Sequence, residues 1–130
     1  MKAVIVNFLG QERYLAFTGR AMFRLLDEFG GMQELLEQIS PETNDGLSAL
    51  CKAVCILAEE GELGRRALGY DKSPIADWNV LFVTISPKEM AILKSAIPKA
   101  IELGYLREIE PENNEIDLGL AEINQKKTKN

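Results

Sequence analysis

The clearest pattern along this chain is the 3.6-residue period of amphipathic helices, which first occurs in residues 17–39. Apolar residues recur there every three or four positions on both sides of Gly30 and Gly31, with charged residues between them. Thr18 is suited to cap the first turn, and Gly30 suits the left-handed conformation that ends many helices. The stretch therefore predicts two helices separated by the glycines. Helices this short are marginal alone, so both need a shared core.

A β-hairpin is predicted before these helices. Residues 2–9, KAVIVNFL, are rich in Val, Ile and Phe, which is typical of a strand. A turn at residues 10–12 and a second run at residues 13–17, RYLAF, complete the hairpin. Since a lone hairpin is not stable, one of its faces must lie on the helices or on another sheet.

A third helix is predicted after the polar loop at residues 40–46, with Asn44 or Asp45 as its cap. Its buried face is marked by apolar residues at the most regular spacing in the chain, at positions 47, 50, 51, 54, 57 and 58. Residues 59–62 interrupt this period, but Leu63, Ala67 and Leu68 could continue the apolar stripe to about Gly69. The more polar residues 59–72 are expected to form a solvated end of the helix.

Two further helices are predicted between residues 73 and 104. Residues 75–85, IADWNVLFVTI, are β-branched and aromatic like a buried strand, but they follow a helix-start signal at Ser73 and Pro74, and we predict a helix. Residues 86–89, SPKE, are a capping box with Pro at the first helical position. The helix that they open is expected to end at Gly104 and to kink at its internal proline. Its predicted buried stripe consists of Met90, Leu93, Ile97, Ala100 and Ile101.

Residues 105–123 fit two structures equally well. One is a weak hairpin with arms at residues 106–109 and 116–120, and the other is a solvated acidic extension. Residues 124–130 are predicted to be disordered. The fold class is therefore α+β and mainly α: one domain over residues 1–104, with an N-terminal hairpin followed by a bundle of about five helices.

Composition narrows the function more than any motif does. The net charge of −5 and the pI near 4.8 argue against nucleic acid or an anionic membrane as a partner, because both are bound through a basic face. The chain has no histidine, which is the commonest general base and metal ligand. We therefore expect no enzyme activity, no metal and no cofactor. With no signal peptide at Met1 and no apolar run long enough to span a bilayer, we expect a cytoplasmic protein.

Two groups of residues are candidates for chemistry or binding. Cys51 and Cys55 lie four residues apart in a helical pattern, which predicts two small core residues and not a redox or zinc site. The second group is the one aromatic-rich neighbourhood of the chain, formed by Tyr70, Trp78, Leu81 and Phe82. Two interpretations of this group are open. It belongs to the core, or it forms a hydrophobic surface that docks a partner, where aromatic residues dominate the binding energy.

The order of these elements resembles a known family. A short hairpin, residues 13–39 with the sequence RYLAFTGRAMFRLLDEFGGMQELLEQI, a polar loop and a mostly helical remainder are similar to the tail assembly chaperones of long-tailed bacteriophages and prophages. Residues 86–101, SPKEMAILKSAIPKAI, resemble the last helix of that family. The likeness spans residues 3–103. Within the first motif it rests on Phe17, Thr18, Ala21, Leu25, Leu26, Phe29 and Gly30.

This resemblance implies a small, non-enzymatic protein that binds the tape-measure protein in the cytoplasm of the bacterial host. Members of the family act during tail assembly, are absent from the mature virion and tend to form homo-oligomers. The physical pattern is compatible with this role, because amphipathic helices and acidic charge suit a protein that shields a long hydrophobic partner.

Two alternative functions are open on the sequence. One is a structural or self-assembling component of the tail or virion. The other is a winged-helix-like regulatory protein, because residues 86–120 run in the order helix, GYL, predicted hairpin. The acidic residues of that predicted hairpin would repel phosphates and oppose DNA binding; they are Glu108, Glu110, Glu112, Glu115 and Asp117.

Overall fold

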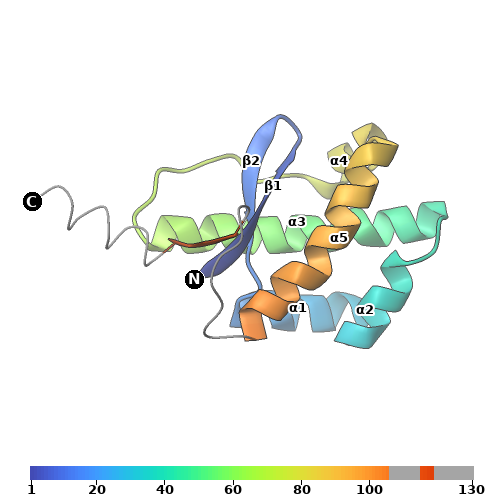
Figure 1. Ribbon diagram of the computed structural model, residues 1–130, viewed down its shortest axis with the longest axis horizontal. Coiled ribbons are helices and arrows are strands. Elements are labelled where there is room, and N and C mark those ends of the chain that lie inside the picture. Colours follow the sequence, from blue (N-terminus) through green and yellow to red (C-terminus); the bar gives the residue numbers. More distant parts are fainter. Residues whose placement is uncertain (106–114, 119–130) are drawn as a thin grey trace, which may run out of the picture.

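The computed structural model describes residues 1–105 and 115–118, with the backbone alone for 115–117. A small sheet and five helices make up this described part (Figure 1). Their bounds are β1 Lys2–Phe8, β2 Gln11–Leu15, α1 Gly19–Phe29, α2 Met32–Ile39, α3 Asn44–Ala67, α4 Trp78–Thr84, α5 Pro87–Tyr105 and β3 Glu115–Asp117. The predicted class, a mainly helical α+β fold with an N-terminal hairpin and five helices, is confirmed.

The sheet has the order β2-β1-β3 and is antiparallel throughout. In β1 the side chains of Val4, Val6 and Phe8 are buried while Asn7 is exposed, so one face of the strand packs on the helices. β3 pairs with β1 through the register Ala3 with Ile116. The other arm of the predicted C-terminal hairpin, like the predicted disordered end, lies outside the described residues.

Both helices of residues 17–39 form as predicted, and the two caps of α1 are the predicted ones. Thr18 accepts a hydrogen bond at its Oγ1 from the backbone N–H of Ala21 (3.2 Å), and Gly30 ends α1 in the left-handed conformation at φ 96°. The Gly30 N–H donates to the carbonyl of Leu26 (2.8 Å). These contacts are local, which is why the sequence was sufficient to find them.

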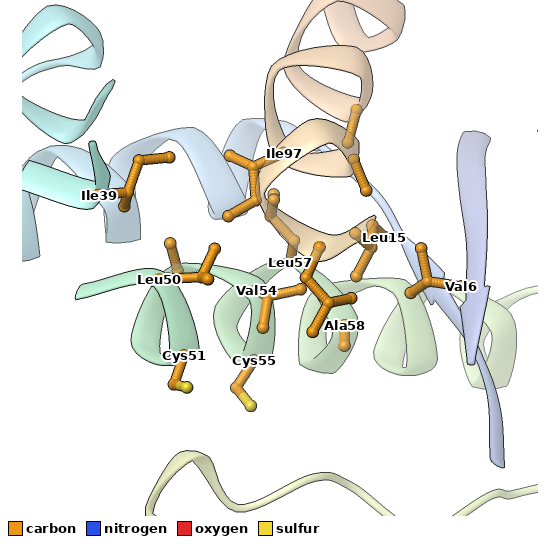
Figure 2. Close-up of a cluster of buried hydrophobic side chains, with 14 of the residues drawn as sticks. Val6, Leu15, Ile39, Leu50, Cys51, Val54, Cys55, Leu57, Ala58 and Ile97 are labelled. Atoms are coloured by element: carbon orange, nitrogen blue, oxygen red, sulfur yellow. The ribbon is translucent and has the colours of Figure 1, made fainter. Parts of the chain in front are cut away.

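α3 is the central element of the fold. Figure 1 shows α1 and α2 on one side of it and α4 on the other, with α5 crossing it, and all four helices contact it. In Figure 2 Leu50 and Ile97 meet on the side of α3 that faces α5, whereas Cys51 and Cys55 point to the opposite side. Both sides are buried, so the cysteines are core residues as predicted.

The start of α3 differs from the prediction. Thr43, and not Asn44 or Asp45, is the capping residue, because it has the extended backbone that a cap requires and its Oγ1 accepts from the N–H of Gly46 (3.1 Å). The helix therefore begins before the residues that were expected to cap it.

The prediction of a solvated helix end at residues 59–72 is wrong for residues 60–62, which are buried, whereas Ala67, Gly69, Asp71 and Lys72 are exposed. α3 continues through Gly61 and Gly64 without a break, and Glu60 and Glu62 are only 3% and 7% exposed. Gly61 is a contact site, because a Cβ at this position would overlap the carbonyl oxygen of Tyr14 in β2. The glycines bring the backbone of α3 close to the hairpin, and they do not end the helix.

Glu62 explains why this polar stretch can be buried. Its carboxylate accepts hydrogen bonds from Arg65 Nη1 (2.7 Å), Arg66 Nε (2.7 Å) and the backbone N–H of Ser73 (2.9 Å). Burial opposes ionisation of Glu62, but these three donors outweigh it and lower its pKa. The carboxylate thus stays charged inside the fold and links α3 to the segment that follows it.

The predicted helix start at Ser73 and Pro74 is also wrong, although the predicted helix itself exists as α4. Residues 70–77 form neither helix nor strand, and arginine side chains donate to several of their carbonyl groups. Arg66 Nη2 donates to the Ser73 carbonyl (3.0 Å) and Arg13 Nη1 to the Pro74 carbonyl (3.0 Å). We call residues 70–77 the strap. α4 begins only after the strap, where the Asp77 carboxylate accepts from the N–H of Asn79 (2.8 Å).

α5 opens with the predicted capping box. The N–H of Ser86 donates to Glu89 Oε1 and the N–H of Glu89 donates to Ser86 Oγ, both at 3.2 Å. The helix runs to Tyr105, one residue beyond the predicted end, since Gly104 lies inside the last turn against Phe17. Of the predicted stripe, the fully buried members are Leu93, Ile97 and Ala100, and the half-buried members are Met90 and Ile101.

Candidate docking surfaces

The four residues of the predicted aromatic neighbourhood do not form one surface. Leu81 is fully buried under α4 and belongs to the core. Trp78 and Phe82 lie one turn apart on the same helix, half-buried, with their rings in an edge-on contact at 6.2 Å between centroids. These three residues are therefore together, and Trp78 and Phe82 keep part of their surface in solvent.

Tyr70 lies apart from this group, at the start of the strap. The guanidinium of Arg65 lies between two rings, 5.1 Å from the centroid of Tyr70 and 4.8 Å from that of Tyr14. The Tyr70 hydroxyl donates to the carbonyl of Leu118 (2.7 Å), next to β3. Its contacts thus join the strap to the sheet and not to α4.

A groove of about 490 Å³ opens beside Trp78, between α1, α3 and the end of the strap. Its apolar part comes from Trp78, Ile56 and Ile75, and its charged groups are largely paired with one another. Arg24 forms ion pairs with Glu59 and Glu60 at 2.9 Å, and Lys52 Nζ lies 4.7 Å from the centre of the Trp78 ring. This groove is therefore mixed in character and internally neutralised.

The outer face of α4 is the most exposed apolar helix face in the described part of the chain. Val80 is 47% exposed and Val83 78% exposed, and they lie three residues apart, so they share one side of the helix. The sequence contained the signal for this surface, because five of the seven residues in WNVLFVT are apolar. When apolar residues lie on all sides of a helix, the sequence does not indicate which side faces solvent. The sequence therefore could not identify Val80 and Val83 as the exposed residues.

A larger groove of about 690 Å³ lies between the end of α2, the start of α3 and the first turns of α5; we call it the α2–α5 groove. Most of its lining is apolar, from Ile39, Pro41, Leu47, Leu50, Pro87, Met90 and Ala91. Figure 2 shows two of these residues, Ile39 and Leu50, converging from α2 and α3. Because three separate elements contribute, sequence inspection did not detect this groove.

The two cysteines of the described residues are buried in α3. Burial raises the pKa of the Cys51 thiol to about 11 and that of Cys55 to about 12, which keeps both thiols protonated and unreactive at neutral pH. Among residues 1–105 and 115–118, no three His, Cys, Asp or Glu side chains come together as a metal site would require. No helix in the same residues has the length and apolar character to cross a membrane.

Comparison of the chain with protein-family models, with curated proteins and with solved structures gave no match. The two grooves and the outer face of α4 are the candidate docking surfaces of the described residues.

Proposed function

We propose that this protein is a non-enzymatic assembly chaperone that binds the tape-measure protein of a bacteriophage or prophage tail. It would act in the host cytoplasm during tail assembly and would not remain in the mature virion. The observation that supports the proposal is α4, in which Leu81 is buried on one side while Val80 and Val83 face solvent on the other. Helices with apolar residues on all sides are usually covered on all sides, and a partner would provide the missing cover.

The chemistry of this surface suits a long hydrophobic partner. Hydrophobic contact is non-directional and depends mainly on the apolar area removed from water, so it tolerates variation in the sequence that is bound. Fully burying a valine side chain stabilises a contact by about 1.5–3 kcal/mol, so a two-valine face would bind each partner segment weakly. Several copies along one long chain would then shield it while each copy remains able to leave. This reversibility is what an assembly factor needs.

The predicted residues Trp78, Leu81 and Phe82 have a place in this proposal. Leu81 anchors α4 to α3, and the half-buried rings of Trp78 and Phe82 would extend the contact of a bound partner around the helix. Tyr70 would contribute indirectly, because it fastens the strap that leads into α4.

Co-expression with the tape-measure protein tests the proposal. Val83→Asp places a charge at the centre of the outer face and leaves helix propensity nearly unchanged. We expect about tenfold less tape-measure protein in the soluble co-purified fraction, because burying an unpaired carboxylate opposes binding. Phe23→Asp on α1 is the matched control, since Phe23 is also well exposed, at 62%, and it should co-purify like the wild type. Equal recovery with Val83→Asp and wild type would contradict the proposed role of α4.

Two measurements separate this proposal from the alternatives raised by the sequence. A structural tail component would be present in purified particles, whereas an assembly chaperone would be found only in assembly intermediates. A winged-helix-like regulator would bind DNA with an affinity that falls steeply with salt.

A further inference from the structure

The α2–α5 groove lies beside a strongly acidic stretch of the chain. Arg24 and Lys52 are consecutive basic residues in the sequence, and no Lys or Arg lies between them. The same stretch holds six exposed carboxylates: Asp27, Glu28, Glu34, Glu37, Glu42 and Asp45. It therefore contributes a charge of −6 where the whole chain has −5, so the remainder of the chain has a net charge of +1. Asp27 and Glu28 lie on α1. The other four carboxylates lie on α2 and on the loop and first turn that lead into α3, which form one side of the groove.

Little in the described structure neutralises these carboxylates at the groove. Glu42 lines the groove, and neither Glu42 nor Asp45 forms an ion pair with the described residues. Lys94 also lines it, but its Nζ donates to the carbonyl of Ser40 (2.7 Å), which fastens α5 to the loop after α2. The groove thus has an apolar floor, an acidic side formed by α2 and the loop after it, and the positive charge of Lys94 on the α5 side.

We propose that the α2–α5 groove binds an amphipathic helix of a partner protein that carries Lys or Arg along the margins of its apolar stripe. The groove's apolar floor, built from helix side chains such as Leu47 and Met90, is suited to take the stripe in the helix-in-groove manner. The acidic side selects basic flanks, because like charges placed against Glu42 would oppose binding. This surface does not include Val80 or Val83, so the inference is independent of the function proposed above.

A designed helical peptide provides the probe. We would measure, by fluorescence anisotropy, binding of an 18-residue labelled peptide with leucines at helical spacing and lysines at the margins. A second peptide has glutamates in place of the lysines. The lysine peptide should bind at least about tenfold more tightly than the glutamate peptide, and its affinity should fall by several-fold as salt is raised from about 50 to 500 mM. Equal binding of the two peptides would overturn the proposal.

Variants locate the site. Ala91→Arg both fills the groove and adds a positive charge, and it should weaken binding of the lysine peptide by about tenfold or more. Ile92→Arg is the matched control, because Ile92 is the next residue of α5, is 49% exposed and does not line the groove. Its affinity should remain within about twofold of wild type. Equal losses in both variants, with circular dichroism showing both folded, would place the peptide elsewhere and overturn the proposal.

A charge variant and a competitor complete the test. Glu42→Gln should weaken the lysine peptide by about threefold and reduce the salt dependence, whereas Glu102→Gln near the other end of α5 should do neither. Residues 119–130 of this chain include Lys126, Lys127 and Lys129 and are tested as a free peptide. This peptide could bind as tightly as the designed one, with an affinity that Ala91→Arg weakens. The occupant of the groove would then be a second copy of this chain, and the proposal of a different partner would be overturned.

Discussion

Both halves of α3 contain buried residues, but these residues are held by different interactions. Residues 44–58 pack through apolar side chains such as Leu50 and Leu57, which have almost no exposed surface. Residues 59–67 contain the buried carboxylates Glu60 and Glu62, each with two arginine partners. The comparison teaches that a break in the hydrophobic period does not mark the end of burial when arginines lie close enough to pair with the carboxylates.

The two kinds of packing differ in how they respond to change. Apolar contacts depend on area and volume, so a smaller side chain weakens them by an amount that follows the cavity left behind. A buried ion pair depends on its partners, and removing one leaves the other charge uncompensated. The four predictions below test whether this difference determines stability in each half.

The largest expected effect is in the apolar half. Leu57→Ala should lower the free energy of unfolding by about 3–4 kcal/mol, because the fully buried leucine leaves a cavity among closely packed neighbours. Urea unfolding followed by circular dichroism measures this change. Leu36→Ala on α2 is the control, since Leu36 is 42% exposed and should lose less than about 1 kcal/mol. Similar losses in both variants would mean that Leu57 is not a core residue.

Glu62→Gln should have a smaller but clear effect in the polar half. The amide keeps the shape of the side chain but removes the charge that faces Arg65 and Arg66. We expect a loss of about 2 kcal/mol, below the usual range for a buried pair, because Arg66 retains some contact with water. The same unfolding experiment measures it, with the exposed Glu102→Gln as the control. An unchanged stability would show that the cluster contributes nothing.

The stability difference between wild type and Glu62→Gln should depend on pH. The pKa of Glu62 is lowered in the folded state. The contribution of its charge to the free energy of unfolding is therefore complete above the pKa of an unfolded glutamate, about 4.3, and is lost as pH falls through the folded pKa. The difference should therefore be constant from about pH 6 to 8 and should shrink below about pH 4. Unfolding curves of both proteins across this range measure it. A difference that grows on acidification would have the wrong sign for this mechanism.

The smallest effect concerns the thiols and leaves stability unchanged. Cys51 and Cys55 have pKa values of about 11 and about 12, and both are buried, so a disulfide reagent at pH 7.5 should not label them in the folded protein. Complete labelling is expected in urea. Any slow labelling of the folded protein requires the thiols to become exposed. If the two halves of α3 unfold together, this labelling should be faster in Glu62→Gln than in wild type, because the variant unfolds more often. Faster labelling in a variant whose stability is unchanged would instead indicate local opening around the thiols.

Local chemistry explains which parts of the fold the sequence could predict. The caps at Thr18 and Ser86 involve partners three residues away, and the period of α1 and α2 repeats within one or two turns. The burial of Glu62 was missed because one of the groups that donates a hydrogen bond to its carboxylate, the N–H of Ser73, is 11 residues away in the strap. Gly61 was misinterpreted for the same reason, since the carbonyl that it accommodates belongs to Tyr14 in β2.

The candidate surfaces were predictable only in part. The sequence located α4 through Trp78, Leu81 and Phe82, but an element that is apolar on all sides does not reveal which side faces inward, and Val83 was not singled out. The α2–α5 groove was not predictable, because it exists only where the ends of three helices meet. Tyr70 was grouped with α4 by its position in the sequence, whereas its hydrogen bond joins it to Leu118.

The close approach of α3 to β2 has a consequence for how this protein behaves at high concentration. The N–H of Ala16 donates to the Leu57 carbonyl (3.2 Å), and the carbonyl of Tyr14 faces Gly61. The backbone at the end of β2 therefore lies against α3, so this part of the sheet edge is covered by a helix. Open sheet edges are the usual templates for aggregation. The contact with α3 therefore protects this part of β2 from pairing with a strand of another chain.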